Sequence, residues 1–173
     1  MEFDARQIGV LPTTPAYVVG MIDSGVIKMA LGAPLIEAGF KKKSDSWYLG
    51  NDEVALLVNI QKSQYGGQYY VNCGISVRSF GGVEFPKEQN CHIRFRLTAI
   101  LPEEKRKEFE ALFDLESEFF SDHRRSEEIS RLVKNIVLPI LQRCSYREGI
   151  VEAVRSGALA NAMMYKEIKE WVD

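Results

Sequence analysis

The side chains best suited to chemistry in this sequence are polar groups spaced two residues apart along predicted β-strands. Alternate residues of a strand share a face, so side chains of one parity are brought together. Arginine can hold a carboxylate or phosphate through two parallel N–H bonds, amides add single hydrogen bonds, and histidine can change its charge near neutral pH. The polar set that lies opposite the main apolar face comprises Asn59, Gln61, Tyr70, Asn72, His92, Arg94 and Arg96. These residues are candidate ligand-binding residues, and the opposite parity of Lys62 leaves it outside the set.

This polar set has three interpretations. A one-sided antiparallel sheet needs a polar outer face, and pairs of Arg with Tyr or Asn form across strands without any function. A small anionic ligand is the second interpretation, and a protein partner is the third. Leu57 and Ile100 have the same parity and are apolar, which favours the protein partner because apolar surface groups mark interaction sites.

A β-hairpin between Glu53 and Phe80 is the element that must position these residues. Apolar residues occupy every second position in residues 54–61 and again in residues 69–78, which is the pattern of half-buried strands. Gly66 and Gly67 lie between the two runs and can adopt the positive φ that tight turns need. Residues 46–49 and 91–100 show further strand patterns. Short connections between four consecutive strands predict an antiparallel meander.

Segments with helical periodicity precede and follow these strands in the sequence. Residues 24–40 carry an apolar stripe, and Gly32 and Pro34 within it predict a kink or two short helices. A second helix is expected from Pro102, and the clearest one starts after Ser126 and should bend at Pro139. The predicted fold class is therefore α+β: a four-stranded antiparallel meander covered on one face by an N-terminal helix and several C-terminal helices.

Two smaller segments complete the expected architecture. The run Lys41–Lys43 follows a helix end that Gly39 marks, and it suits either the negative end of the helix dipole or a solvated edge strand. After a short helix that ends near Gly157, a last helix is expected to bury Met163 and Trp171, among other residues.

Length and composition set broad bounds. With 173 residues the chain fits a single domain, 1–173, with residues 1–17 as an extended or flexible arm. The net charge of −2 gives no general attraction to nucleic acid, and no apolar run is long enough for a membrane span. The three cysteines lack CxxC spacing and are expected to be free core thiols in a cytoplasmic protein.

No cofactor, metal site or catalytic residue is predicted. Cys91 and His92 are sequence neighbours, so in a strand they point to opposite faces and cannot act as a nucleophile–base pair. His123 lies in a charged segment and is expected at the surface. The sequence also lacks the P-loop, GxSxG and HExxH patterns and any GxGxxG that follows a strand.

The order of short motifs resembles a known family. GFKKK ends the first helix, an aromatic strand with Trp47 and Tyr48 follows, and then come NIQKS, YYVNCGI, HIRFRL and VLPIL. This arrangement resembles the uncharacterised bacterial domain of unknown function 4304 family over residues 26–154. The resemblance implies a bacterial origin and one α+β domain, and it carries no activity, substrate or site residue to transfer.

A non-enzymatic binding module for a protein partner, for example an immunity-like protein, is the leading functional hypothesis. The alternative is a small anionic-ligand or enzymatic site on the polar face of the sheet. A homodimer through that face, or through the edge strand that begins at Ser46, is a third hypothesis.

Overall fold

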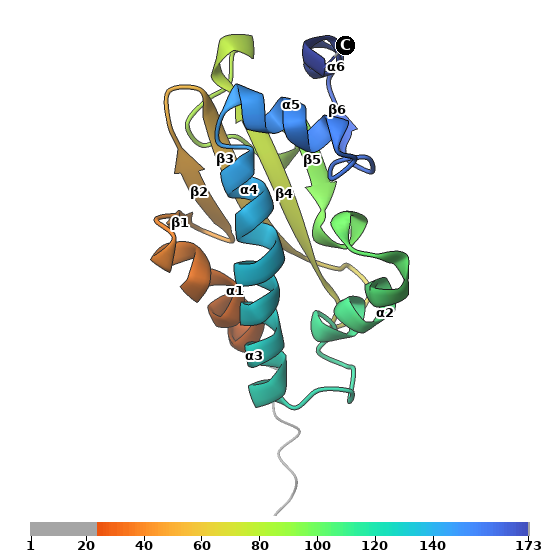
Figure 1. The fold of residues 1–173 in the computed structure, drawn as a ribbon. Coiled ribbons are helices and arrows are strands. Elements are labelled where there is room, and N and C mark those ends of the chain that lie inside the picture. Colours follow the sequence, from red (N-terminus) through yellow and green to blue (C-terminus); the bar gives the residue numbers. More distant parts are fainter. Residues whose placement is uncertain (1–23, 173) are drawn as a thin grey trace, which may run out of the picture.

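The computed structural model describes residues 24–172, so the predicted arm at residues 1–17 lies outside the described residues. Its sheet has six antiparallel strands in the order β1-β2-β3-β4-β5-β6 (Figure 1). The strands are β1 (Lys41–Lys43), β2 (Ser46–Gly50), β3 (Val54–Lys62), β4 (Tyr69–Val77), β5 (Ile93–Arg96) and β6 (Met163–Met164). The predicted α+β class and antiparallel sheet are confirmed, but the sheet has six strands rather than four.

The two additional strands are the edges of the sheet. The lysine run forms β1, so the edge-strand interpretation of Lys41–Lys43 is confirmed. β6 consists of only two residues, too few to produce an alternating pattern in the sequence. The prediction that Met163 is buried in a helix is wrong, because this residue pairs with Arg94 at the sheet edge and is 62% exposed.

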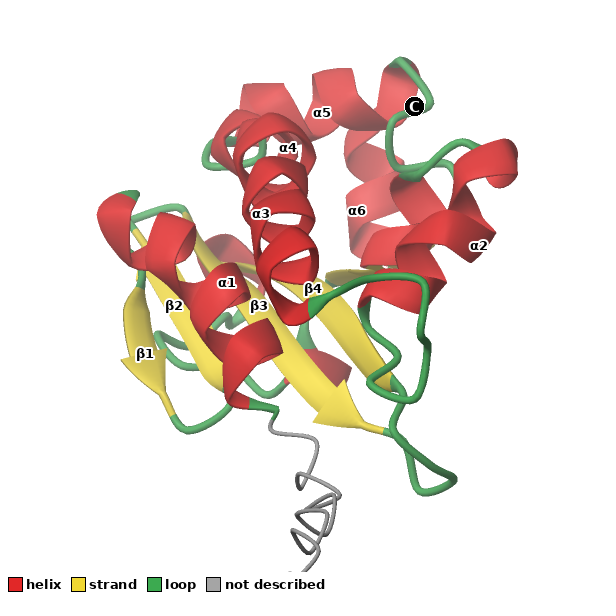
Figure 2. Cartoon of the chain, turned by 90° about the horizontal axis from the view of Figure 1, so that it is seen from below, coloured by secondary structure: helices red, strands yellow, loops and turns green. Residues whose placement is uncertain are grey.

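The helices gather on one face of the sheet, called here the helix-covered face (Figure 2). They are α1 (Gly25–Glu37), α2 (Glu103–Leu112), α3 (Asp122–Leu132), α4 (Leu138–Arg143), α5 (Arg147–Arg155) and α6 (Lys166–Val172). Four short non-α turns join elements: η1 (Arg78–Phe80), η2 (Glu88–Asn90), η3 (Leu97–Ile100) and the π-helical η4 (Val133–Val137). The opposite side of the sheet is called the second face.

The first helix continues through both Gly32 and Pro34, so of the two predicted outcomes, a kink or two short helices, the second is wrong. Pro34 has no N–H to donate to the carbonyl oxygen of Ala30, and Ser130 Oγ of α3 donates to that oxygen instead, at 3.2 Å. Gly32 lies against the indole of Trp47, where an added Cβ would stand 2.9 Å from Cζ2. These two residues therefore bring α1 close to both α3 and the sheet.

The long helical rod α3–η4–α4 crosses the helix-covered face (Figure 1). It begins earlier than the sequence predicted, at Asp122 rather than after Ser126, because Ser121 Oγ caps it by accepting the Arg124 N–H at 3.3 Å. Next to Pro139, where a bend was expected, the rod contains a π turn, in which the Leu138 N–H bonds to Val133 O. This wider turn gives room where the proline ring would meet the carbonyl of the preceding turn.

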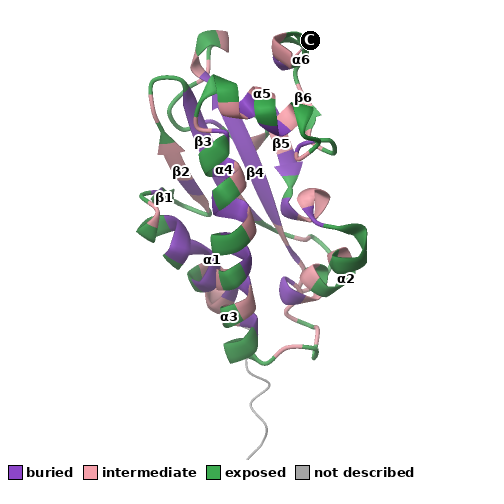
Figure 3. Cartoon of the chain, in the orientation of Figure 1, coloured by how far each residue is buried: buried purple, intermediate pink, exposed green. Residues whose placement is uncertain are grey.

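The core lies between the sheet and these helices, and buried residues run along β3, β4 and the rod (Figure 3). Cys73, Cys91 and Cys144 are buried and free, which confirms their prediction as core thiols. Burial raises the pKa of each thiol to about 12.

Candidate functional site

The strand register places most of the predicted polar residues on the second face. One row of paired residues crosses five strands: Lys43 opposite Ser46, Ser46 opposite Asn59, Asn59 opposite Asn72, and Asn72 opposite Arg96. Gln61 and Tyr70 form the adjacent pair. The group formed by Lys43, Ser46, Asn59, Gln61, Tyr70, Asn72 and Arg96 is called the polar patch below. Asn72 is buried, with 7% of its surface exposed, and the other six are partly or fully exposed. The register reproduces the shared face that was predicted for Asn59, Gln61, Tyr70, Asn72 and Arg96, and it adds Lys43 and Ser46.

The side chains of the polar patch hold one another in place. The Asn59 amide donates to Ser46 Oγ at 2.9 Å and to Asp45 O at 3.1 Å. The Asn72 amide donates to Gln61 Oε1 at 3.2 Å, across the strand pair. The Arg96 guanidinium stacks on the Tyr70 ring at 4.0 Å from its centroid. Such mutual contacts reduce the side-chain freedom that binding would otherwise remove.

His92 is used differently from the rest of the predicted set. It precedes β5, and its side chain is 7% exposed. Its Nδ1 accepts the Val77 N–H at 2.9 Å, so the neutral ring carries its proton on Nε2, which lies 3.2 Å from Phe80 O. The Tyr165 ring packs edge-on against it. The imidazole therefore anchors main chain, and its two nitrogens are not presented on the polar patch.

The chain itself covers the other half of the second face. Residues 81–91 fold back over β3 and β4, and Cys91 lies so close to Gly74 that an added Cβ would stand 2.5 Å from Cys91 Sγ. Leu57 is only 1% exposed. The expectation that Leu57 and Ile100 lend apolar character to an open surface is therefore wrong. Ile100 belongs to η3 and packs partly buried against the core, because the strand predicted over 91–100 ends at Arg96.

Arg94 and Arg96 differ in their neighbours. Arg94 pairs with Gly74 and Met163, beside the segment that covers the sheet, while Arg96 is exposed at the open end of its strand. A small hollow next to Arg96 and Tyr70 has a volume of only about 40 Å³, and Glu110 lies on its wall. This is far below the roughly 300–1,000 Å³ of sites that enclose small ligands.

A larger cleft that sequence reasoning missed opens at the β2 end of the second face. It has a volume of about 260 Å³, and its walls include Lys41, Tyr48, Arg78, Glu84 and Phe85. Phe85 meets the Tyr48 ring edge-on at 5.3 Å between centroids, and Arg78 Nε donates to Asn51 O at 3.3 Å. The signal in the sequence is weak, because Glu84 and Phe85 come from a segment with no periodic pattern.

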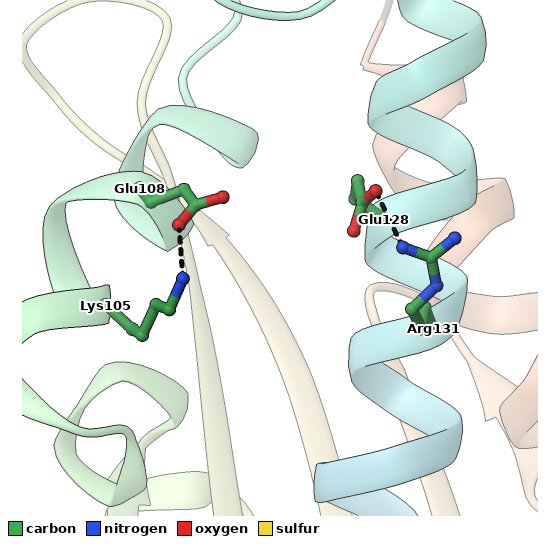
Figure 4. Close-up of polar contacts among 4 residues, drawn as sticks. All are labelled: Lys105, Glu108, Glu128 and Arg131. Carbon is green, nitrogen blue, oxygen red and sulfur yellow. Dashed lines mark hydrogen bonds and ion pairs between the residues drawn. The ribbon is translucent and has the colours of Figure 1, made fainter.

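Charged groups pair mostly on the helices. The ion pairs found among residues 24–172 include Lys105–Glu108 on α2 and Glu128–Arg131 on α3, both of which Figure 4 shows. Within the same residues, no group of acidic, His and Cys side chains is arranged to hold a metal ion. No helix in this part of the chain combines the length and apolar character needed to cross a membrane.

Comparison with known proteins gives one match. A family model with the description Domain of unknown function (DUF4304) matches residues 31–143, well over half of the chain. This segment runs from α1 to α4 and contains the whole polar patch. The comparisons with curated proteins and with solved structures returned no match. The predicted resemblance is confirmed, and the chain belongs to the domain of unknown function family DUF4304.

Proposed function

We propose that this protein is a non-enzymatic binding module that meets a protein partner through its polar patch. The observation that carries the proposal is the row of five paired residues from Lys43 to Arg96. Asn59 bonds to Ser46 within the row, and Asn72 and Arg96 are held by the adjacent Gln61 and Tyr70. Neighbouring strands lie about 4.8 Å apart, so the row extends over about 19 Å, the scale of a protein contact rather than of a small molecule.

The composition of this region also supports a protein partner. Interface cores are enriched in aromatic residues, Met and Arg. Tyr70 and Arg96 form a stacked pair within the polar patch, and the exposed Met163 lies beside Arg94 in the adjacent row. Residues of these types bury large contact areas, so they are good candidates for the groups that contribute most to binding energy. An immunity-like protein is one class of molecule that acts in this way.

The proposal is tested by affinity capture from the native host with a matched pair of variants. Wild type should retain a stoichiometric partner, Arg96→Glu should lose it, and Arg131→Glu should retain it. Arg131 is a suitable control because it is exposed on α3, which packs on the opposite face of the sheet. If the partner is captured equally by all three proteins, the polar patch is not the binding surface.

The alternative, a small anionic ligand, makes a separate prediction. A ligand present at about 100 times its dissociation constant stabilises a fold by about 2.7 kcal/mol. A thermal-shift screen with phosphate, sulfate, nucleotides and small carboxylates should show no shift if the polar patch serves a protein partner. A shift that disappears in Arg94→Ala/Arg96→Ala would favour the ligand site instead.

A further inference from the structure

The charge of the second face carries a further inference. The strand register assigns side chains from all six strands to this face, and none of them is an Asp or Glu. The cations among them are Lys41, Lys43, Arg94 and Arg96. The whole chain, by contrast, has more acidic than basic residues. The strand side chains of the second face are therefore cationic or neutral on a protein whose net charge is −2. The acidic groups near them come from other segments: Glu84 lines the cleft with Lys41, and Glu110 lines the small hollow beside Arg96.

Lys43 and Arg96, at the two ends of the polar patch, take part in none of the ion pairs of the described residues. Among residues 24–172, the ion pairs use other cations, namely Lys28, Lys105, Arg131, Lys134 and Lys166. Aromatic rings position two of the cations of the second face instead: the Lys43 ammonium lies 4.9 Å from the Phe85 centroid, and Arg96 stacks on Tyr70. A cation–π contact orients the group and leaves its positive charge available to an anion.

The two ends of the polar patch are cationic and its centre is neutral. Lys43 lies at one end of the row and Arg96 at the other, while Ser46, Asn59 and Asn72 lie between them. Four strand spacings separate the ends by about 19 Å. A complementary surface would carry carboxylates at that separation and neutral hydrogen-bonding groups between them.

We infer that the partner presents an acidic protein segment whose carboxylates meet Lys43 at one end of the polar patch and Arg94 and Arg96 at the other. This inference rests on the proposed function. A polyanionic nucleic acid fits less well, because amides and a hydroxyl separate the cations and the net charge of the chain is negative.

A fluorescein-labelled peptide of eight glutamates is the first probe. Fully extended, it spans about 26 Å and can reach both ends of the row. Fluorescence anisotropy should show binding that weakens strongly between about 20 and 200 mM salt, because the contacts are charge–charge contacts at a surface. The Lys43→Glu/Arg96→Glu variant should bind at least about tenfold more weakly than wild type. Both residues are exposed, so the variant should keep the wild-type melting temperature.

A charge-matched control excludes a general effect of net charge. Lys105→Glu/Arg131→Glu changes the total charge by the same amount at exposed helix positions, and it should bind like wild type. Equal weakening in both double variants would overturn the inference. Tighter binding of a twelve-nucleotide single-stranded DNA than of the glutamate peptide, also lost in Lys43→Glu/Arg96→Glu, would overturn it in favour of nucleic acid.

The captured host partner separates this inference from the proposed function. A partner that is released by high salt and lost in Lys43→Glu/Arg96→Glu supports both. A partner that resists salt and this charge reversal, yet is lost in Tyr70→Ala/Met163→Ala, overturns the acidic segment and leaves the binding module standing. If all of these variants still capture the partner, the proposed function itself is overturned.

Discussion

Arg125 provides the sharpest test of how the C-terminal helices are held. Its side chain is 2% exposed, and the guanidinium donates to four main-chain carbonyls. Nη1 reaches the oxygens of Leu112 at 2.6 Å, Asp114 at 2.8 Å and Ala111 at 3.0 Å, and Nη2 reaches Ser117 at 3.0 Å. The side chain thus joins α3 to the C-terminal end of α2 and to the segment that follows it.

We expect Arg125→Met to destabilise the fold by about 3–5 kcal/mol, because main-chain carbonyls lose their buried donor at about 1–3 kcal/mol each, and removal of the buried charge offsets part of this loss. Simple addition of four hydrogen bonds at about 1.5–3 kcal/mol each would give about 6–12 kcal/mol. That sum neglects the cost of burying the guanidinium, whose Nε has no hydrogen-bond partner in the part of the chain that the structure describes. Burial also lowers the pKa of Arg125, while Asp122 and Asp114 oppose this shift.

Urea denaturation followed by circular dichroism measures the change, and the melting temperature should fall by about 2–4 °C for each kcal/mol. Arg131→Met is the matched control, because the ion pair of Arg131 among residues 24–172 is with Glu128 at the surface (Figure 4), and the change should cost less than about 1 kcal/mol. Arg125→Lys keeps the charge but lacks the planar fork, so it should recover only part of the loss. A cost below about 1 kcal/mol for Arg125→Met would refute the reasoning.

Three further outcomes are expected. Gly32→Val should lower the free energy of unfolding by about 2–3 kcal/mol, because the new side chain would meet the Trp47 indole. Ala33→Val, at the exposed neighbouring position, should lower it much less, and equal effects of the two substitutions in urea denaturation would contradict this packing. His92→Ala should cost about 2–4 kcal/mol, because it leaves main-chain groups of β4 and η1 without their partner, and an unchanged urea midpoint would speak against that anchor. The buried thiols, whose pKa is raised from 9.0 to about 12, should react with a thiol reagent at pH 8 only after unfolding, and rapid labelling of the native protein would exclude their burial. Because the folded state binds these protons more tightly than the unfolded state, their contribution to stability is complete below about pH 9 and declines as the pH rises toward 12.

The sequence predicted best where periodicity reports burial directly. Alternation along β3 and β4 predicted both strands and the shared face of Asn59 and Asn72, because one side of each strand had to be apolar. The same reasoning extended β5 too far, since residues 97–100 keep the alternating pattern while folding as the turn η3. Local pattern cannot separate these outcomes when a run is short.

Contacts between distant segments could not be read from the sequence. Residues 81–91 can cover the second face because Gly74 has no side chain to collide with Cys91. His92 anchors the main chain through its contacts with Val77 N–H and Phe80 O. Both sets of contacts join segments that approach closely only in the folded structure, so they produce no periodic pattern in the sequence. The two-residue strand β6 likewise exists only because β5 is already in place.

The π turn between α3 and α4 has a consequence for changes of chain length. A π turn holds one residue more than an α turn, so the two halves of the rod are offset in helical phase by one position. Leu138 is buried after the turn, while Ile136 and Ile140, which would continue the earlier stripe, are only partly buried. A single-residue deletion within Val133–Val137 would remove the extra residue, convert the rod to regular α-helix and leave α4 with the same face toward the sheet. A single-residue deletion inside α3 or α4 would instead rotate the rest of the rod by about 100°, so the π turn is the place where the rod should best tolerate the loss of one residue.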